Sequence, residues 1–212
     1  MTDRIGYGLL SDTDIKTLLG KHIKITSPGN ETVMYSEKQI QVGSIDLHFQ
    51  REFKRIHIPD GKVLTYDMIE KHNYTEEDKV VGDGKLRIEP REILLTTTLE
   101  TIRLSPDIAG FVFGRSSIAR LGIMVHCAQA FINPGHGSTI PLQIVNMAPC
   151  PVELDFEIPI CQLVLFALNT PASVSYSEKM DSKYKYEEFP GDSKIYLDKE
   201  THSMKAKIIE EN

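Results

Sequence analysis

The chain has 212 residues, of which 41% are hydrophobic and 25% charged, a composition ordinary for a globular protein that buries its own core. Its length fits one large domain or one domain with extensions. The formal net charge of -6 argues against a general nucleic-acid binder, which carries a basic surplus. A local pocket on an acidic protein can still be positive, so a small anionic ligand is not excluded.

The cysteines and the apolar runs indicate a cellular compartment. Cys127, Cys150 and Cys161 form no CxxC pair and leave an odd count, which argues against a disulfide framework and favours a reducing cytoplasm. The N-terminal MTDRIGYGLLSDTD lacks the apolar core of a signal peptide, and no apolar run reaches membrane-spanning length. We therefore expect a cytoplasmic protein.

The first half of the chain predicts one helix and one strand. In LLSDTDIKTLLGK, Ser11 or Asp12 can cap a short helix, Gly20 can end it, and one face would carry Ile15, Leu18 and Leu19. QVGSIDLHF alternates as a half-buried strand does, with one side carrying Val42, Ser44, Asp46 and His48.

Residues 60–90 are polar and rich in turn formers, so we expect a loop or hairpin outside the core. From residue 91 onward, short β-branched runs are separated by Pro, Gly, Asn and Asp, which predicts a β-sandwich or barrel. The segment after Pro171 is polar and poor in aliphatic residues, and it reads as a loose C-terminus or as a lid that orders over a ligand. We expect a β-barrel domain over 1–172, with a variable excursion at 55–90, and a lid or tail over 173–212.

The stretch GRSSIAR carries the chemistry of an anion site. Arg115, Ser116, Ser117 and Arg120 offer two guanidinium groups and two hydroxyls at the start of a possible helical turn, and these groups suit an oligophosphate. A surface turn whose arginines pair with acidic neighbours would read the same way, and composition alone favours that alternative.

Two polar side chains follow this stretch. Asn133 begins the tight turn Asn-Pro-Gly-His, where an acid could activate water but an amide cannot take a proton near neutral pH. In TIPLQIVN, Gln143 lies on one strand face with Pro141 and Val145, opposite an apolar face. Gln143 could equally face a ligand or make a buried hydrogen bond.

The nearby histidines, His126 and His136, could act as acid or base, but lone histidines in such places are more often structural. A zinc deaminase is disfavoured, because the chain has no H-x-E and no P-C-x-x-C to hold the metal and move the proton.

Together these segments resemble the dCTP deaminase/dUTPase family, and most closely its bifunctional dCTP deaminase–dUTPase branch. LLSDTDIKTLL is similar to the family's opening helix, QVGSIDLHF to its first signature strand, and TLETIRLSPDIAGFVFGRSSIARLGI to the run into its phosphate motif. IPICQLVLF resembles the strand that closes the core, and YSEKMDSKYKY the C-terminal lid. The resemblance spans residues 8 to 195, with 55–90 poorly matched.

The resemblance implies a mainly β fold, a distorted antiparallel β-barrel or jelly-roll-like domain of the dUTPase kind with a short N-terminal helix and a C-terminal lid. It implies a homotrimer with sites between subunits, a deoxypyrimidine nucleotide as ligand, and magnesium on the substrate triphosphate, with no zinc and no metal held by the protein. Neither nucleic acid nor membrane is expected as a partner.

Site residues carried over by position fall into two groups. Phosphate contacts would come from Arg115, Ser116 and Ser117, with Lys183 and Tyr184 added by the lid, while Ser116 and Arg120 would help to hold the catalytic water. The remaining substrate contacts are expected at Gln129, Phe131, Gln162, Tyr176 and Glu187.

The sequence departs from the family pattern at both catalytic carboxylates. Gln143 stands where the deaminases carry the glutamate that moves protons, and Asn133 stands where the dUTP-hydrolysing enzymes carry the aspartate that activates water. Further departures occur at Gln129, Ala130, Ser138 and Glu187. Losing a general acid–base costs about a hundred- to ten-thousand-fold in rate, so the usual mechanism should fail.

Three hypotheses remain open. The chain is a deoxynucleotide hydrolase in which His136, Asp46 or Glu187 supplies the missing base. Alternatively, it is a nucleotide-binding or regulatory module without catalysis, because an amide can still recognise a pyrimidine edge. In the third hypothesis, the altered hairpin and Glu187 select a ligand less anionic than a triphosphate.

Overall fold

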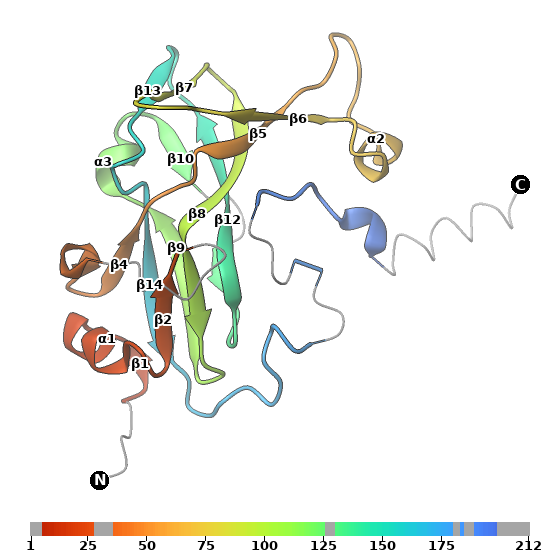
Figure 1. The fold of residues 1–212 in the computed structure, drawn as a ribbon. Helices are drawn as coiled ribbons and strands as arrows, with labels where there is room; N and C mark the ends of the chain where they lie inside the picture. Colours follow the sequence, from red (N-terminus) through yellow and green to blue (C-terminus); the bar gives the residue numbers. More distant parts are fainter. Residues whose placement is uncertain (1–5, 28–35, 126–129, 180–182, 185–188, 199–212) are drawn as a thin grey trace, which may run out of the picture.

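Two antiparallel sheets form the body of the protein in the computed structural model (Figure 1), which describes residues 6–27, 36–125, 130–179, 183–184 and 189–198. Within these residues one six-stranded sheet runs β11-β9-β14-β4-β3 with β1 also on β14, and a second runs β10-β12-β8-β5-β6 with β2 also on β8. We call them sheet A and sheet B. A two-stranded sheet, β13-β7, completes the body, and the mainly β, antiparallel architecture expected from the sequence is confirmed.

The elements have the following bounds. The strands are β1 (Gly8–Leu9), β2 (Ile23–Thr26), β3 (Ile40–Gln41), β4 (Ser44–Leu47), β5 (Glu52–Ile56), β6 (Thr75–Lys79), β7 (Leu86–Ile88), β8 (Ile93–Leu104), β9 (Ile108–Gly114), β10 (Ile123–Val125), β11 (Phe131–Ile132), β12 (Gly137–Asn146), β13 (Val152–Leu154) and β14 (Cys161–Ala167). The helices are α1 (Asp12–Leu18), α2 (Tyr66–Glu70) and α3 (Ser116–Ala119), with 3-10 turns η1 (Glu37–Gln39) and η2 (Ile195–Leu197). No helix in the described part of the chain is both long and apolar enough to span a bilayer.

The predicted first helix is confirmed as α1. Ser11 caps it through a capping box with Asp14, in which each side chain bonds the other residue's backbone N–H. Ile15 and Leu18 are buried, and the chain leaves the helix at Gly20, whose φ of +80° is readily adopted by glycine.

The strand predicted over QVGSIDLHF is present as β4, but its predicted polar face is exposed only in part: Val42 is 85% exposed, whereas Ser44 and Asp46 are buried. Ser44 and Asp46 are 7% and 4% exposed, close to the complete burial of Ile45 and Leu47 on the other face. The reason is tertiary: Gln39 donates to the backbone oxygen of Asp46 (3.0 Å), and Arg115 pairs with its carboxylate (3.2 Å), so other segments cover this face.

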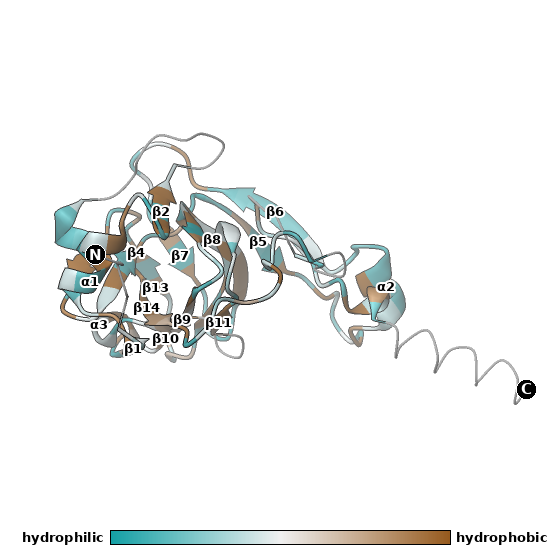
Figure 2. Ribbon diagram, turned by 90° about the horizontal axis from the view of Figure 1, so that it is seen from below, coloured by the Kyte–Doolittle hydropathy of each residue, from teal (hydrophilic) through white to brown (hydrophobic). Residues whose placement is uncertain are grey.

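The 60–90 excursion is more ordered than predicted. Leu86 and Ile88 of β7 are buried, against expectation, because β7 pairs with β13 and contributes to the core. The preceding part, β5, α2 and β6 with their connections (residues 52–79), extends away from the body as an arm whose β6 is largely hydrophilic (Figure 2). The strands predicted after residue 91 are confirmed as β8, β9, β12, β13 and β14.

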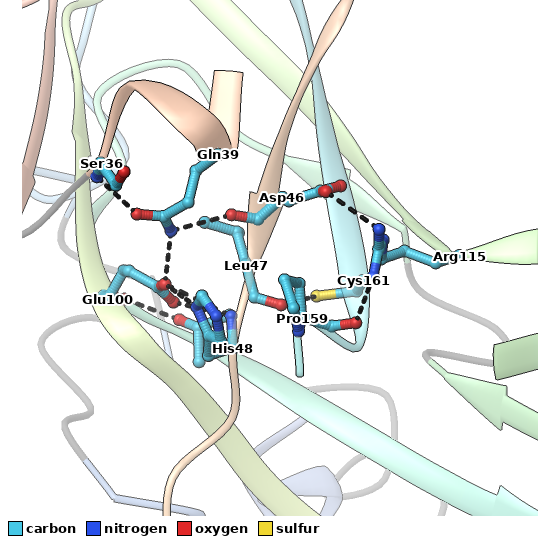
Figure 3. A network of polar contacts seen from close by, with 10 residues as sticks. Ser36, Gln39, Asp46, Leu47, His48, Glu100, Arg115, Pro159 and Cys161 are labelled. Atoms are coloured by element: carbon cyan, nitrogen blue, oxygen red, sulfur yellow. Dashed lines mark hydrogen bonds and ion pairs between the residues drawn. The ribbon is translucent and has the colours of Figure 1, made fainter. Parts of the chain in front are cut away.

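A buried carboxylate joins the two sheets. Glu100 of β8, 1% exposed, accepts from the backbone N–H (3.0 Å) and Nδ1 (2.8 Å) of His48 and from Nε2 of Gln39 (2.9 Å), as Figure 3 shows. The hydrogen bond and charge of Glu100 raise the pKa of His48. Gln39 and His48 belong to the chain around β4, so Glu100 of sheet B fixes an edge of sheet A.

We expect Glu100→Ala to lower the free energy of unfolding by about 3–5 kcal/mol, because it leaves buried donors without their acceptor. Urea denaturation measures this change. Glu153→Ala, which removes an exposed carboxylate from β13, is the control and should stay within about 0.5 kcal/mol of the wild type. Equal effects of the two substitutions would contradict this role of Glu100.

Candidate functional site

The GRSSIAR stretch forms a short exposed corner at the end of β9. Arg115 precedes α3, and the side chains of Ser116, Ser117 and Arg120 lie on exposed residues, while Ile118 packs into the core. The buried Ile118 fixes this helical turn, and the two hydroxyls and the Arg120 guanidinium on it are exposed to solvent. This arrangement is suited to an anionic ligand.

Arg115 is not directed at solvent alone. Its guanidinium pairs with Asp46 (3.2 Å) and donates to the carbonyl oxygen of Pro159 (3.0 Å), as Figure 3 shows. Burial raises the pKa of Asp46, although the positive charge of Arg115 opposes that shift. Gln162 lies across from Asp46 in the neighbouring strand and is partly buried. Asp46 therefore holds Arg115 at the start of the corner and is poorly placed to serve as a free base.

The tight turn predicted at residues 133–136 is confirmed. The N–H of His136 donates to the oxygen of Asn133 (3.1 Å), and Gly135 has φ +75°, as the third position of a type II turn requires. The structure brings Tyr176 to this turn: its N–H donates to the oxygen of Pro134 (2.9 Å), and its ring stacks beside His136 at 6.4 Å.

His136 is buried and neutral near pH 7. Its Nε2–H donates to the carbonyl oxygen of Ser138 (3.1 Å), and desolvation lowers the pKa of His136 to about 4. An imidazole this enclosed and this weakly basic is a structural part of the turn rather than a good base for water.

Gln143 lies on the outer face of β12, as its strand pattern predicts. Its neighbours Leu142 and Ile144 are buried, whereas Gln143 is only partly buried, opposite Leu95 of β8. Phe131, predicted to contact substrate, is 44% exposed and lies on the outer face of sheet A.

That outer face carries an aromatic cluster that sequence reasoning did not identify. The ring of Phe111 lies 5.3 Å from Phe131, 6.2 Å from Phe113 and 5.7 Å from Phe166. The alternation of FVFG in β9 was the available signal, because residues two apart share a strand face.

One chain does not bring the Asn133 turn and the α3 corner together. Phe131 pairs with Phe111 and Ile132 with Gly110, so Asn133 lies near Ala109. Six extended residues separate that position from Arg115, which is about 20 Å. Lys183 and Tyr184 contact Asp198 and Lys194 of the C-terminal segment. His126, Gln129 and Glu187 fall outside the described residues.

Neither of two surface cavities coincides with these motifs. One, of about 700 Å³, lies between β5, β6 and residues 189–191, and the other, of about 650 Å³, lies beside His48 and Glu100. Among the residues that the structure describes, no group of three or more His, Cys, Asp or Glu side chains could hold a metal ion.

Gly135→Ala should lower the free energy of unfolding by at least about 1 kcal/mol, because a left-handed φ is costly for alanine. Its Cβ would also lie 2.5 Å from that of Ser175. Hydrogen exchange should show that residues 175–177 lose protection. The control is Gly137→Ala, whose new Cβ meets nothing closer than 3.9 Å and whose φ is not left-handed; it should leave that protection intact.

The buried His136 should make stability depend on pH. Its folded pKa, about 4, lies below the unfolded value of about 6.5, so the unfolded chain binds the extra proton between these pH values. The contribution of His136 to stability is therefore lost as the pH falls from 6.5 towards 4. Between pH 6.5 and 4.5 the wild type should lose about 2 kcal/mol more than His136→Gln, measured by urea unfolding. Parallel pH profiles would contradict this assignment.

Comparison with known proteins identifies the family. A family model described as dCTP deaminase-like matches residues 9–168. The "dCTP deaminase, dUMP-forming" of Dictyoglomus turgidum is 33% identical over 191 residues, covering 90% of this chain and 96% of the relative. The protein of the same name from Methanosphaera stadtmanae is 35% identical over 192 residues, covering 90% and 95%.

A solved structure shares the fold. The 2'-deoxycytidine 5'-triphosphate deaminase from Agrobacterium tumefaciens superposes with a TM-score of 0.58 at 18% identity, over 76% of this chain and 49% of that chain. The mainly β fold of dCTP deaminases and dUTPases expected from the sequence is thereby confirmed. By the matched model and the relatives, the chain belongs to the dCTP deaminase-like family.

Proposed function

We propose that this chain binds deoxypyrimidine triphosphates and acts as a hydrolase of the dCTP deaminase type, converting dCTP to dUTP and hydrolysing dUTP to dUMP. The observation that carries this proposal is the α3 corner, where Ser116, Ser117 and Arg120 are exposed together behind a buried Ile118. Relatives about one-third identical over most of the chain bear the name dUMP-forming dCTP deaminase, which supports it.

The proposed roles follow from chemistry. The hydroxyls of Ser116 and Ser117 and the guanidinium of Arg120 would bind phosphate oxygens and the reacting water. Arg115 could reach a phosphate only by sharing its guanidinium with Asp46. Magnesium bound to the triphosphate would neutralise part of its charge. Its ligands would be phosphate oxygens and water, which Mg²⁺ usually keeps when it binds with a nucleotide.

We propose that the complete site needs more than one copy of the chain. The Asn133 turn and the α3 corner lie about 20 Å apart within a chain. A single bound nucleotide therefore cannot place its reacting ring next to both motifs of the same chain. The exposed aromatic face around Phe131 gives a second copy an apolar surface to cover. These features support the homotrimer that the resemblance implies.

A second function is favoured by the two amides. Gln143 and Asn133 replace the carboxylates expected from the family resemblance. Of the substitute bases considered, Asp46 is paired with Arg115 and His136 is buried and weakly basic. Glu187 lies outside the described residues. A member that recognises the nucleotide but catalyses poorly, as a binding or regulatory module, is therefore the alternative.

Gln143→Glu discriminates between these functions. If only the carboxylate is missing, Gln143→Glu should raise the rate of deamination of dCTP by about a hundredfold or more. The measurement is anion-exchange separation of dCTP, dUTP and dUMP after incubation with magnesium. Asn133→Asp, tested in the same assay, should raise the rate of dUTP hydrolysis.

The wild type and one binding variant complete the experiment. Turnover by the wild type that is lost in Arg120→Ala supports an active hydrolase that uses another base. Saturable binding of dCTP without turnover, with turnover gained in Gln143→Glu, supports the binding module. Absence of binding to dCTP and dUTP by the wild type would refute both functions.

A further inference from the structure

The C-terminal segment 189–198, which we call the strap, is fastened to the arm by one buried carboxylate. The side chain of Asp192 is 6% exposed. It accepts from Nζ of Lys54 (3.2 Å), from Oγ1 of Thr75 (2.8 Å) and from Nδ1 of His72 (2.9 Å). These donors come from β5, from β6 and from the turn that follows α2, so Asp192 joins the strap to three segments of the arm.

Further contacts align the strap. The N–H of Ser193 donates to the hydroxyl oxygen of Tyr74 (2.7 Å), a buried residue of the arm. The ring of Tyr196 meets His72 edge-on at 6.0 Å. The strap is therefore fixed in both position and direction.

The strap in turn contacts the two lid residues expected to bind a triphosphate. The N–H of Lys194 donates to the hydroxyl oxygen of Tyr184 (2.8 Å), and its Nζ lies 5.2 Å from that ring's centre. Lys194 Nζ also donates to the backbone oxygen of Lys183 (2.9 Å), and Lys183 pairs with Asp198. Tyr184 and the backbone of Lys183 are thus positioned through Lys194.

The two kinds of contact differ in strength. Removing one partner of a buried, hydrogen-bonded ion pair is strongly destabilising, so the Asp192 contacts hold firmly. Lys183 and Asp198 are 30% and 37% exposed, and an exposed ion pair contributes little and can exchange partners readily. The lid is therefore firmly anchored at Asp192, whereas the Lys183 ammonium can exchange its partner Asp198 for another anion.

The anchor lies on the face that carries Gln143. Gln143 pairs with Leu95, and Leu95 pairs with Lys54, so these side chains project from the same side of sheet B. Two strand spacings separate Gln143 from Lys54, about 10 Å.

We propose that the arm is a dock for the lid and that Asp192 is its positioning residue. Docking orders Lys183 and Tyr184 before nucleotide arrives, and Lys183 then exchanges Asp198 for a phosphate oxygen. This inference rests on the proposed binding of a deoxypyrimidine triphosphate. It adds that the contact between the strap and the arm contributes to the affinity for that triphosphate. Preordering reduces the entropy that binding must otherwise offset.

The test compares Asp192→Asn with the wild type in the full chain, and it has two readouts. Hydrogen exchange without nucleotide should show loss of protection in residues 189–198, with β8 and β14 unchanged. The Kd for dCTP with magnesium should rise about tenfold, the cost of ordering one or two side chains on binding. Asp192→Glu, which keeps the carboxylate, should recover part of that affinity.

Asp67→Asn is the matched control, since it makes the same change on α2 at an exposed carboxylate that pairs with Lys71. It should leave both readouts as in the wild type. Unchanged strap exchange in Asp192→Asn overturns the dock, and equal affinity of wild type and Asp192→Asn overturns its role in binding. A wild type that binds no dCTP refutes the proposed function, while strap exchange still decides whether Asp192 is the anchor.

Discussion

The carboxylate of Glu100 accepts hydrogen bonds from His48 and Gln39 and so joins sheet B to the β4 edge of sheet A. The rest of the site follows from that connection. Gln39 also holds the backbone of Asp46, Asp46 pairs with Arg115, and Arg115 is the residue from which α3 begins. A chain of polar contacts thus extends from the middle of one sheet to the exposed hydroxyls at the end of the other. Its two carboxylates, Glu100 and Asp46, are buried, where hydrogen bonds are costly to leave unmade, and together with the buried Ile118 they hold the corner in place.

The sequence predicted the local features and missed those that depend on distant partners. Helix α1 could be predicted from Ser11 and the apolar spacing, and the turn at Asn133 from Pro-Gly, because the signals lie within a few residues. The burial of Asp46 could not, since the residues that cover it come from other segments. The docking of the strap was equally inaccessible: Asp192 meets Lys54 and Thr75 across 138 and 117 positions. A polar, aliphatic-poor segment read alone gives no sign of such partners.

Recognition and chemistry make different demands on the same scaffold. Recognition needs donors and acceptors in fixed places, and an amide at Gln143 supplies both. Chemistry needs a group that takes up and releases a proton near neutral pH. Of the two described candidates, Asp46 is paired with Arg115, and the pKa of His136 is lowered to about 4. At these described positions the chain therefore offers an amide, together with a paired carboxylate and a buried, weakly basic imidazole.

The contact between the Asn133 turn and residues 175–177 gives the C-terminal part of the chain a second point of attachment. Tyr176 and Ser177 donate to the oxygens of Pro134 and Gly135, and Asp192 fastens the chain to the arm. The chain between these points is a closed loop rather than a free end. The entropic cost of closing such a loop is incurred when the protein folds, and this cost grows only slowly with the length of the loop. Insertions between the two attachments should consequently be tolerated far better than any substitution that breaks one of them.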